Sequence, residues 1–430
     1  MTGEPVTEST GAAPPATPAT PATPPTPPTP PAVADDASWI ARAAAVIPGA
    51  ASTGSKRPAV LYGTDEPAGP THFARASGCR VVTAGGRELV DFTMALGSVA
   101  LGYADPDVVR AATRALADGN VAGLSHVREV ELAERLCAVV PCAEQVRFLK
   151  SGAEGVAAAV RIARATTGRD GVVACGYFGW LDWCTDAPGV PAGARADVRE
   201  VPFDDVAALE DAVAAFGSRL AAVVLEPVQE RLPSPAWTER ARQLCERAGA
   251  VLVFDEVKTG FRLRPGGYQE LAGVRPHVAV FGKALANGLP LAAVVGEAAV
   301  MEAARRSWIS STLAGETVAL AAAGAVLDRH AREDVCAAIG RCGERQREIA
   351  QAAIDAAAMG GRIAVAGLAP MWFLRYADAD HERRAVAALV RHGVLLKRGA
   401  YNFPSPAHDE DALARLADAL PAALAETAAS

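Results

Sequence analysis

Lysines are rare in this sequence, and two of them lie beside acids or apolar segments that suit chemistry. The chain of 430 residues has five lysines, at positions 56, 150, 258, 283 and 397. Lys258 lies three residues after Asp255 in VLVFDEVKTGFR (251–262), and Lys283 follows an apolar run in FGKALANG (281–288). A lysine whose pKa is lowered by burial and neighbouring cations can form a Schiff base with a carbonyl compound. The question is which lysine and which acid work together.

Three short apolar segments that the pattern predicts as strands each end near a functional group. They are LAAVVLEPV (220–228), AVLVFDEV (250–257) and HVAVFGKAL (277–285), with Glu226, Asp255 and Lys283 at their ends. The intervals between these residues are 29 and 28 positions, and each accommodates a crossover helix, the second less clearly. This rhythm is typical of parallel βαβ units, whose strand ends face a ligand crevice. One such acid alone is more often part of an ion pair or a helix cap, whereas three successive strand ends indicate a site.

Two further segments offer groups that suit an anionic, planar ligand. In SGAEGVAAAVRIAR (151–164), small residues open a helix whose free N–H groups favour an anion, although an ordinary tight turn explains the same residues equally well. GYFGWLDW (176–183) packs in the core or stacks a ring on a planar ligand. A lysine, an acid, a phosphate cradle and an aromatic ring together match the needs of pyridoxal phosphate (PLP), an electron sink held by a lysine Schiff base and an acid at its ring nitrogen.

Composition and charge exclude several other classes of protein. The net charge is −7 without a basic block, which argues against nucleic acid or an anionic membrane as a partner. No apolar run reaches the roughly 18 residues of a membrane span, and no secretory signal is visible. The eight cysteines form no C-x-x-C pair, so we expect free thiols and no metal site. A cytoplasmic, reduced protein is the consistent expectation.

The sequence pattern predicts a tail and three further segments. Residues 1–35 include TPATPATPPTPPTPP and are expected to form a disordered tail, with a peptide for a proline-reading module as the less favoured reading. Residues 78–93 alternate around a Gly-Gly turn and predict a hairpin. We expect 36–95 to belong to a small domain, 96–325 to form a large cofactor-binding domain and 326–430 to complete the small domain.

VLVFDEVKTGFR followed by FGKALANGLPLAAVVG resembles the signature of class-III PLP-dependent aminotransferases. The similarity is greatest to the branch of glutamate-1-semialdehyde aminomutase and β-amino-acid aminotransferases, and it extends from about VIPGAAST at 46 to the C-terminus. The resemblance implies an α/β protein of fold type I. Its large domain has a mainly parallel, seven-stranded sheet, and a small α+β domain is built from both termini. It also implies a homodimer with shared active sites, a small-molecule amino donor and a carbonyl acceptor.

The same resemblance assigns roles to individual residues. Lys283 forms the Schiff base and shuttles a proton, and Asp255 keeps the pyridine nitrogen protonated. The other implied cofactor contacts are Ser151, Gly152 and Ala153 at the phosphate, Tyr177 and Val257 on the two ring faces, Glu226 as the strand-end glutamate, Gln229 at the 3′ oxygen, and Thr312 at the phosphate of the partner subunit. Lys258 is expected in a loop or behind the site, because side chains three apart on a strand point to opposite faces.

Several positions depart from the family pattern, chiefly on the substrate side. Arg57 matches an arginine that holds a carboxylate in the aminomutase, and Arg398 could meet an anionic substrate or simply lie in a solvated turn. The aminomutase Ser-Trp-Gly is Ala95-Leu96-Gly97 here, so glutamate 1-semialdehyde is not the expected substrate. The other departures are Gly155-Val156, Phe178, Pro276-His277 and Gly315-Glu316-Thr317.

The sequence therefore predicts an aminotransferase for a specialised, secondary-metabolic carbonyl substrate. An aminomutase or racemase of the same family is the alternative, because both would use the same lysine without net amine exchange. A non-catalytic homologue is disfavoured, since both Lys283 and Asp255 are present.

Overall fold

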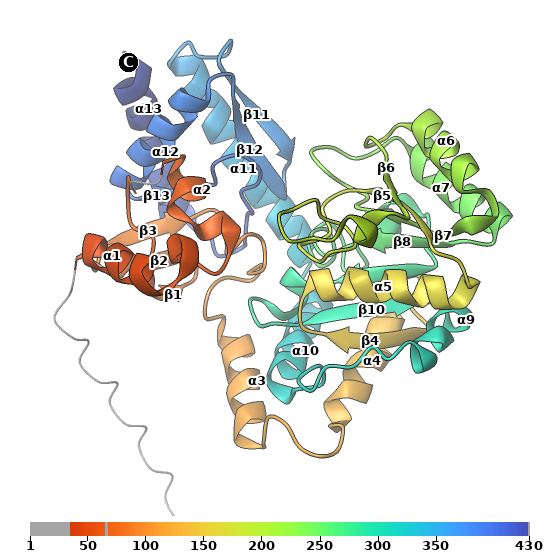
Figure 1. The fold of residues 1–430 in the computed structure, drawn as a ribbon. Helices are drawn as coiled ribbons and strands as arrows, with labels where there is room; N and C mark the ends of the chain where they lie inside the picture. Colours follow the sequence, from red (N-terminus) through yellow and green to blue (C-terminus); the bar gives the residue numbers. More distant parts are fainter. Residues whose placement is uncertain (1–34, 65–67, 429–430) are drawn as a thin grey trace, which may run out of the picture.

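The structure is a computed structural model that describes residues 35–64 and 68–428. A large α/β part surrounds a seven-stranded sheet, and a second part combines the beginning and the end of the chain (Figure 1). The tail predicted for residues 1–35 lies outside the described residues except for Asp35, whose side chain caps the first helix by accepting a hydrogen bond from Ser38 N at 2.7 Å.

The predicted seven-stranded, mainly parallel sheet is confirmed. Only β10 runs antiparallel to its neighbours, so the other strands all end at the same edge. In spatial order the strands are β4 (Gln145–Leu149), β10 (Ala292–Gly296), β9 (Val278–Phe281), β8 (Val251–Asp255), β7 (Leu220–Leu225), β5 (Gly171–Cys175) and β6 (Val198–Glu200).

Helices cover both faces of this sheet, which explains why its central strands are apolar throughout. On β7, Val223 and Leu225 pack with α7 (Pro235–Ala248), whereas Ala222 and Val224 pack with α5 (Gly152–Thr167) on the other face. The crossover predicted between Glu226 and Asp255 is α7. The next interval holds only the short α8 (Tyr268–Ala272), consistent with its weaker pattern. The helices α6 (Val206–Phe216) and α9 (Ala298–Met301) complete the layers.

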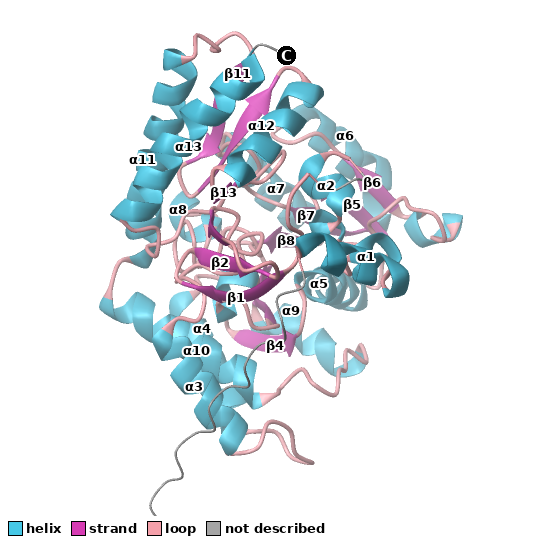
Figure 2. Cartoon of the chain, turned by 90° about the vertical axis from the view of Figure 1, so that its left-hand side faces the viewer, coloured by secondary structure: helices cyan, strands magenta, loops and turns pink. Residues whose placement is uncertain are grey.

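A second group of elements joins both ends of the chain. Figure 1 shows the red N-terminal elements beside the blue C-terminal ones, and Figure 2 shows β11, α12 and α13 above the sheet that contains β1 and β2. This four-stranded sheet has the order β1-β2-β3-β13, and the predicted hairpin is its β2–β3 pair. The elements are α1 (Asp36–Val46), α2 (Pro58–Tyr62), β1 (Phe73–Ser77), β2 (Arg80–Thr83), β3 (Glu88–Asp91), α11 (Val335–Ala356), β11 (Ile363–Leu368), β12 (Met371–Tyr376), α12 (Ala379–Arg391), β13 (Val394–Leu395) and α13 (Glu410–Ala428).

Three helices pack together below the large sheet: α3 (Pro106–Ala117), α4 (Val127–Val139) and α10 (Thr317–Arg332). The domain boundary predicted at 325/326 lies inside α10. Short 3₁₀ helices lie at Pro48–Ala50, Gly54–Lys56, Ala192–Arg195, Gly217–Arg219, Lys283–Ala286 and Glu302–Arg306. Among the described helices, none combines the length and the apolar character needed to cross a membrane.

Candidate active site

Four predicted site residues follow neighbouring strands at one edge of the large sheet. Tyr177 comes after β5, Glu226 directly follows β7, Asp255 ends β8, and Lys283 begins the 3₁₀ helix after β9. The sheet pairs Cys175 of β5 with Leu225 of β7, and Leu225 with Phe254 of β8, the residue before Asp255. The sheet therefore brings the four residues to the edge where open α/β sheets bind ligands.

Lys283 has the environment of a reactive amine. Its backbone is in the left-handed region, with φ of 46°, directly after the extended Gly282. Burial lowers the pKa of Lys283, Asp255 opposes this shift, and Lys258 lowers the pKa further. Within the described residues, the Nζ of Lys283 has no hydrogen bond or ion pair. A lowered pKa increases the fraction of neutral amine, which is the nucleophilic form.

Asp255 is a buried carboxyl group with little hydrogen-bonding support from the protein. It is 6% exposed, and its Oδ1 accepts a hydrogen bond from Val257 N at 3.0 Å. Among the described residues this is its only hydrogen bond. Burial and then the charge of Glu226 raise the pKa of Asp255 to about 7, while Lys283 and Lys258 act in the opposite direction. Its ionised form would be stabilised by a further cation or a charged N–H donor.

Glu256, the second of the two adjacent acids, has a structural role. Its carboxylate accepts hydrogen bonds from the Thr259 hydroxyl, from Tyr268 N at 2.8 Å and from Gln269 N at 3.0 Å. Burial raises its pKa to about 6. Its acceptors are therefore occupied by the turn that leads into α8, so Asp255 is the one of these two adjacent acids that is available to a ligand.

The start of α5 forms a cradle at the same edge. Ser151 and Glu154 form a capping box, in which Ser151 Oγ accepts from Glu154 N at 3.3 Å and Ser151 N donates to Glu154 Oε2 at 2.8 Å. A Cβ atom added to Gly152 would lie 2.9 Å from Val257 Cγ1, so glycine permits close contact between α5 and the end of β8. The first amide groups of a helix lack intrahelical acceptors and can bind an anion.

Substituting Gly152 tests this contact. We expect Gly152→Ala to displace Val257 and to weaken cofactor binding by about tenfold, since packed interiors respond to a single added methyl group. Val257→Ala in the Gly152→Ala background should recover part of this loss, because it removes the clashing methyl groups. Equilibrium dialysis of PLP against the four proteins of this double-mutant cycle measures the coupling. If the losses of PLP affinity in the two single variants simply add in the double variant, the proposed contact between Gly152 and Val257 is contradicted.

The remaining predicted cofactor residues are at the surface or near the rim. Tyr177 is 75% exposed, and its N donates to Glu226 Oε2 at 3.2 Å. Gln229 Nε2 contacts Cys175 Sγ at 3.7 Å. Ala153 packs beside Gly179, where an added Cβ would approach the Ala153 Cβ to 2.4 Å. Thr312 is exposed, and within the described part of the chain the structure does not bring it to the start of α5.

The two predicted substrate arginines flank the short helix α2. Arg57 precedes α2, and its guanidinium packs beside Gly49. Arg398 Nη1 donates to Ala59 O at 3.5 Å, and its Nε lies 3.5 Å from Glu382 Oε2. No contact between described residues joins either arginine to Lys283 or Asp255.

Lys258 lies closer to the other site residues than the sequence predicts. It is in a loop, as predicted, but its Nζ lies 2.6 Å from Glu226 Oε1 and 4.5 Å from the centre of the Tyr401 ring. The physical reason is that β8 ends at Asp255, so strand alternation no longer determines the direction of a side chain three residues later. The motif itself contained this signal, because Thr259-Gly260 marks the turn.

One residue near the end of each motif, Arg262 of VLVFDEVKTGFR and Asn287 of FGKALANG, holds the segment that precedes α3 by hydrogen bonds. Arg262 is buried, and its Nη2 donates to Gly97 O at 2.7 Å. Asn287 Oδ1 accepts from Ala100 N and Leu101 N, each at 2.8 Å. Just before these contacts, residues 94–97 all have positive φ, at 42°, 50°, 59° and 80°. Arg262 and Asn287 belong to the motifs, but the sequence alone did not predict a role for either.

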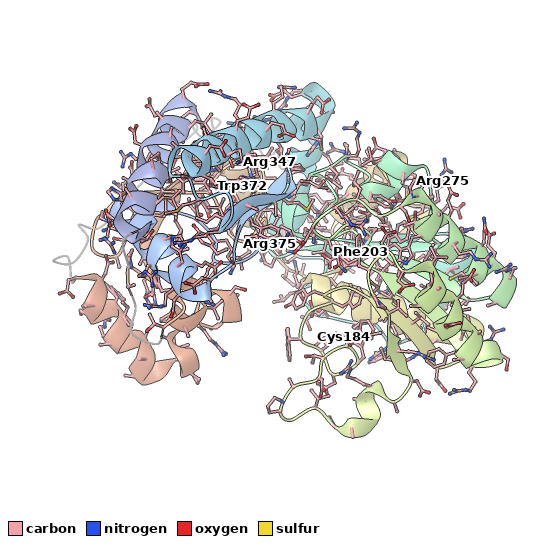
Figure 3. The ribbon with its side chains drawn as sticks, turned by 90° about the horizontal axis from the view of Figure 1, so that it is seen from above. Cys184, Phe203, Arg275, Arg347, Trp372 and Arg375 are labelled. Carbon is pink, nitrogen blue, oxygen red and sulfur yellow. The ribbon has the colours of Figure 1, made fainter. Side chains whose placement is uncertain are left out.

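A cavity of about 320 Å³ lies beside Gln229, between the two parts of the chain. Arg375 of β12 forms an ion pair with Glu230 across the junction, and Arg231 lies over the Phe203 ring at 5.1 Å. Figure 3 shows Arg375 and Phe203 at this junction. The cavity is lined by Phe203, Gln229, Glu230, Arg231, Ala366, Gly367 and Arg375.

Comparison with known proteins identifies the class of enzyme. A family model described as Aminotransferase class-III matches residues 62–402. The 2'-deamino-2'-hydroxyneamine transaminase of Streptomyces kanamyceticus is 36% identical over 360 residues, covering 82% of this chain and 91% of the relative. Glutamate-1-semialdehyde 2,1-aminomutase of Anaeromyxobacter dehalogenans (strain 2CP-C) is 33% identical over 394 residues, covering 84% and 91%.

The solved structures agree with this assignment. The FumI protein of Sphingopyxis sp. MTA144, in its PLP internal aldimine form, superposes with a TM-score of 0.86 at 26% identity, covering 92% of this chain and 96% of that chain. The fold is that of the fold-type I PLP enzymes. The chain belongs to the class-III aminotransferase family and is a PLP-dependent enzyme.

The residues at the sheet edge fit PLP. Among residues 35–64 and 68–428, nothing forms a hydrogen bond or ion pair with the Lys283 amine, and one oxygen of the buried Asp255 carboxylate has no donor. The amide groups at the start of α5 suit a phosphate. Lys283 and Asp255 lie at neighbouring strand ends. The start of α5 lies against Val257, two residues after the end of β8. A ring nitrogen at Asp255, an aldehyde at Lys283 and a phosphate at α5 would each meet complementary chemistry.

Proposed function

We propose that the protein is an aminotransferase that moves an amino group from a small-molecule donor to a specialised carbonyl compound through Lys283. The observation that carries the proposal is that Lys283 and Asp255 lie at the ends of adjacent parallel strands, β9 and β8, within a class-III chain. Bound PLP supplies an electron sink for the substrate Cα–H bond. The protein has to hold that cofactor and move protons.

Each group of the chain has a defined task in this proposal. Lys283 binds the cofactor through its amine and then carries a proton to and from the substrate Cα. Asp255 keeps the ring nitrogen protonated by offering a carboxylate in a poorly solvated place. Gly152 and Ala153 present backbone N–H groups to the phosphate. Val257, which packs beside Gly152 at the start of α5, is proposed to support one ring face, with Tyr177 on the other.

The decisive experiment follows one half-reaction at a time. Purified holoenzyme is mixed with single amino donors and no acceptor, while the spectrum of the bound aldehyde form is recorded. Conversion to the amine form with release of a keto or aldehyde product is expected for at least one donor. If the aldehyde form persists while the donor is rearranged or epimerised, the enzyme is an aminomutase or racemase and the aminotransferase proposal is wrong.

The substrate side of the proposal rests on the cavity beside Gln229. Its lining includes the Glu230–Arg375 ion pair and Arg231, so a polar acceptor would meet charged groups of both signs there. Arg57 and Arg398 are proposed to meet a substrate carboxylate where one is present. The transaminase among the relatives supports a specialised, secondary-metabolic acceptor. The unpaired state of all eight cysteines supports a reducing, cytoplasmic location.

A homodimer with shared active sites is part of the proposal. Several large apolar side chains are unusually exposed around α3, α4 and the Thr312 segment, among them Leu124 at 87%, Val127 at 66% and Trp308 at 88%. Apolar groups gathered in this way suit an interface. Thr312 would then reach the phosphate bound by the partner.

Leu124→Glu tests the dimer. We expect the variant to be largely monomeric by light scattering and to bind PLP more weakly by about tenfold or more, because a buried charge is costly in an interface. Val46→Glu, which replaces an exposed apolar residue of α1 (78% exposed), is the matched control and should stay dimeric. A wild-type enzyme that is monomeric by light scattering and nevertheless catalyses the reaction would refute shared sites.

A further inference from the structure

Lys258 forms a buried ion pair inside the candidate site. Its side chain is 8% exposed, and its Nζ lies 2.6 Å from Oε1 of Glu226, which is 13% exposed. Removing one partner of such a pair leaves the other charge in a poorly solvated place, which is costly. The family resemblance assigns Lys258 no role in the reaction.

Glu226 transmits this contact to the loop that contains Tyr177. Its second oxygen, Oε2, accepts a hydrogen bond from Tyr177 N at 3.2 Å. Gly176 has φ of +136°, and an added Cβ there would lie 2.3 Å from Glu226 Cβ. Burial raises the pKa of the adjacent Cys175 to about 12, so its thiol adds no charge at neutral pH. The direction of the Glu226 carboxylate therefore fixes the beginning of the Tyr177 loop.

Lys258 also contacts the C-terminal part of the chain. Its ammonium group lies 4.5 Å from the centre of the Tyr401 ring, an attractive cation–π geometry. The Tyr401 ring in turn meets Phe373 of β12 edge-on, at 5.5 Å and 87°. Burial raises the pKa of Tyr401, so the ring stays neutral. One ammonium group thus joins the end of β7 to the segment after β13.

The charges at the strand ends are balanced by Lys258. The carboxyl groups are Asp255 and Glu226, and the ammonium groups are Lys283 and Lys258. Glu226 raises the pKa of Asp255, whereas Lys258 and Lys283 lower it. On Lys283, Lys258 and Arg262 lower the pKa, and the two acids raise it. Lys258 therefore favours an ionised Asp255 and a neutral Lys283 at the same time.

We propose that Lys258 is a positioning residue of the reaction centre, which orients Glu226 and the Tyr177 loop and supplies the second positive charge beside the two strand-end carboxyl groups. It does so through Glu226 and Tyr401 and without bonding to the substrate. The proposal rests on the proposed role of Asp255 at the cofactor ring nitrogen. It predicts that the pH dependence of cofactor binding depends on the Lys258–Glu226 pair.

The test measures PLP affinity of the cofactor-free protein against pH by equilibrium dialysis, between about pH 6 and 9. In Lys258→Met, the unpaired Glu226 charge should raise the pKa of Asp255. The pH midpoint of binding should therefore move upward by about one unit, with about tenfold weaker binding at pH 7. The double variant Lys258→Met/Glu226→Gln removes both charges and should return the midpoint close to that of the wild type. Lys258→Arg should retain most of the wild-type behaviour.

Three further variants show the cause if the pH midpoint of PLP binding does not move as expected. Arg329→Met breaks another partly buried pair, Arg329–Asp105 at 3.1 Å between α10 and the start of α3, and should lower stability without moving the midpoint. Glu226→Gln alone should move the pH midpoint of binding downward. If Lys258→Met does not fold, this variant tests the inference in its place. An unchanged midpoint in Lys258→Met, or a double variant no better than the single one, overturns the inference. Asp255→Asn is the separate check, since an unchanged pH dependence there would refute the role of Asp255 itself.

Discussion

Lys283→Ala is expected to reduce aminotransfer by at least about 10³–10⁴-fold, because one substitution removes both the nucleophile and the proton carrier. Cofactor binding should weaken but persist, since the phosphate cradle at α5 and the Asp255 carboxyl group remain. The absorbance band of the cofactor–lysine imine should be absent. Adding a small primary amine should restore part of the turnover, because it can replace the missing side-chain amine without altering the strand ends.

Borohydride reduction identifies the lysine directly. In the wild-type holoenzyme, reduction should fix the pyridoxyl group on the peptide that contains Lys283, as read by mass spectrometry. Lys150→Ala is the matched control, because Lys150 is also close to the start of α5 but is paired with Glu316 at 2.8 Å. That variant should keep the imine band. A pyridoxyl group on Lys258, or an intact imine band in Lys283→Ala, would show that the wrong lysine has been assigned.

Asp255→Asn is expected to separate stability from activity. Activity should fall about 10²–10³-fold, since a preorganised charge beside the reacting group is lost. In the cofactor-free protein, the pKa of Asp255 is raised to about 7 from an ordinary 3.8, so the folded state binds the proton more tightly than the unfolded state. Stability then decreases as pH rises between these values. The variant should be the more stable protein at pH 8, by about 2–4 kcal/mol.

Thermal unfolding of the cofactor-free proteins at pH 5 and pH 8 checks whether the Asp255 carboxyl group lowers stability as pH rises. The melting temperatures should differ little at the lower pH and clearly at the higher one. Asp105→Asn is the matched control: Asp105 is also buried but pairs with Arg329 and caps α3, so its replacement should lower stability at both pH values. With PLP bound, the advantage of Asp255→Asn should shrink or reverse. A less stable Asp255→Asn apoprotein at pH 8 would contradict the electrostatic description.

Much of the fold could be predicted because strand rhythm is a local property. The spacing of Glu226, Asp255 and Lys283 indicated parallel strands, and the structure places all three at one edge. The roles of these residues stay predictions, although the geometry is the one those roles require. The family resemblance supplied the seven-stranded sheet and the cofactor, which the structure and the comparisons confirm.

The environment of Lys258 could not be predicted from the sequence for two physical reasons. Its direction depends on where β8 stops, and strand ends are the least regular part of a hydrophobic pattern. Its ring partner, Tyr401, lies far along the chain, and no local periodicity encodes such a contact. The same limit applies to Arg262 and Asn287, whose partners lie in the segment before α3.

The left-handed turn at residues 94–97 offers a route to new substrate preferences. Three successive non-glycine residues with positive φ cost roughly 1–2 kcal/mol each, so anchors elsewhere must enforce this backbone. Arg262 and Asn287 belong to motifs that the cofactor site requires, and they hold the carbonyl of Gly97 and the amides that follow it. The path of the chain at Ala95 and Leu96 is therefore held by contacts outside the turn, and Ala95 is in addition partly packed against the core. Directed evolution of acceptor range should therefore begin at Leu96, whose side chain is only partly buried.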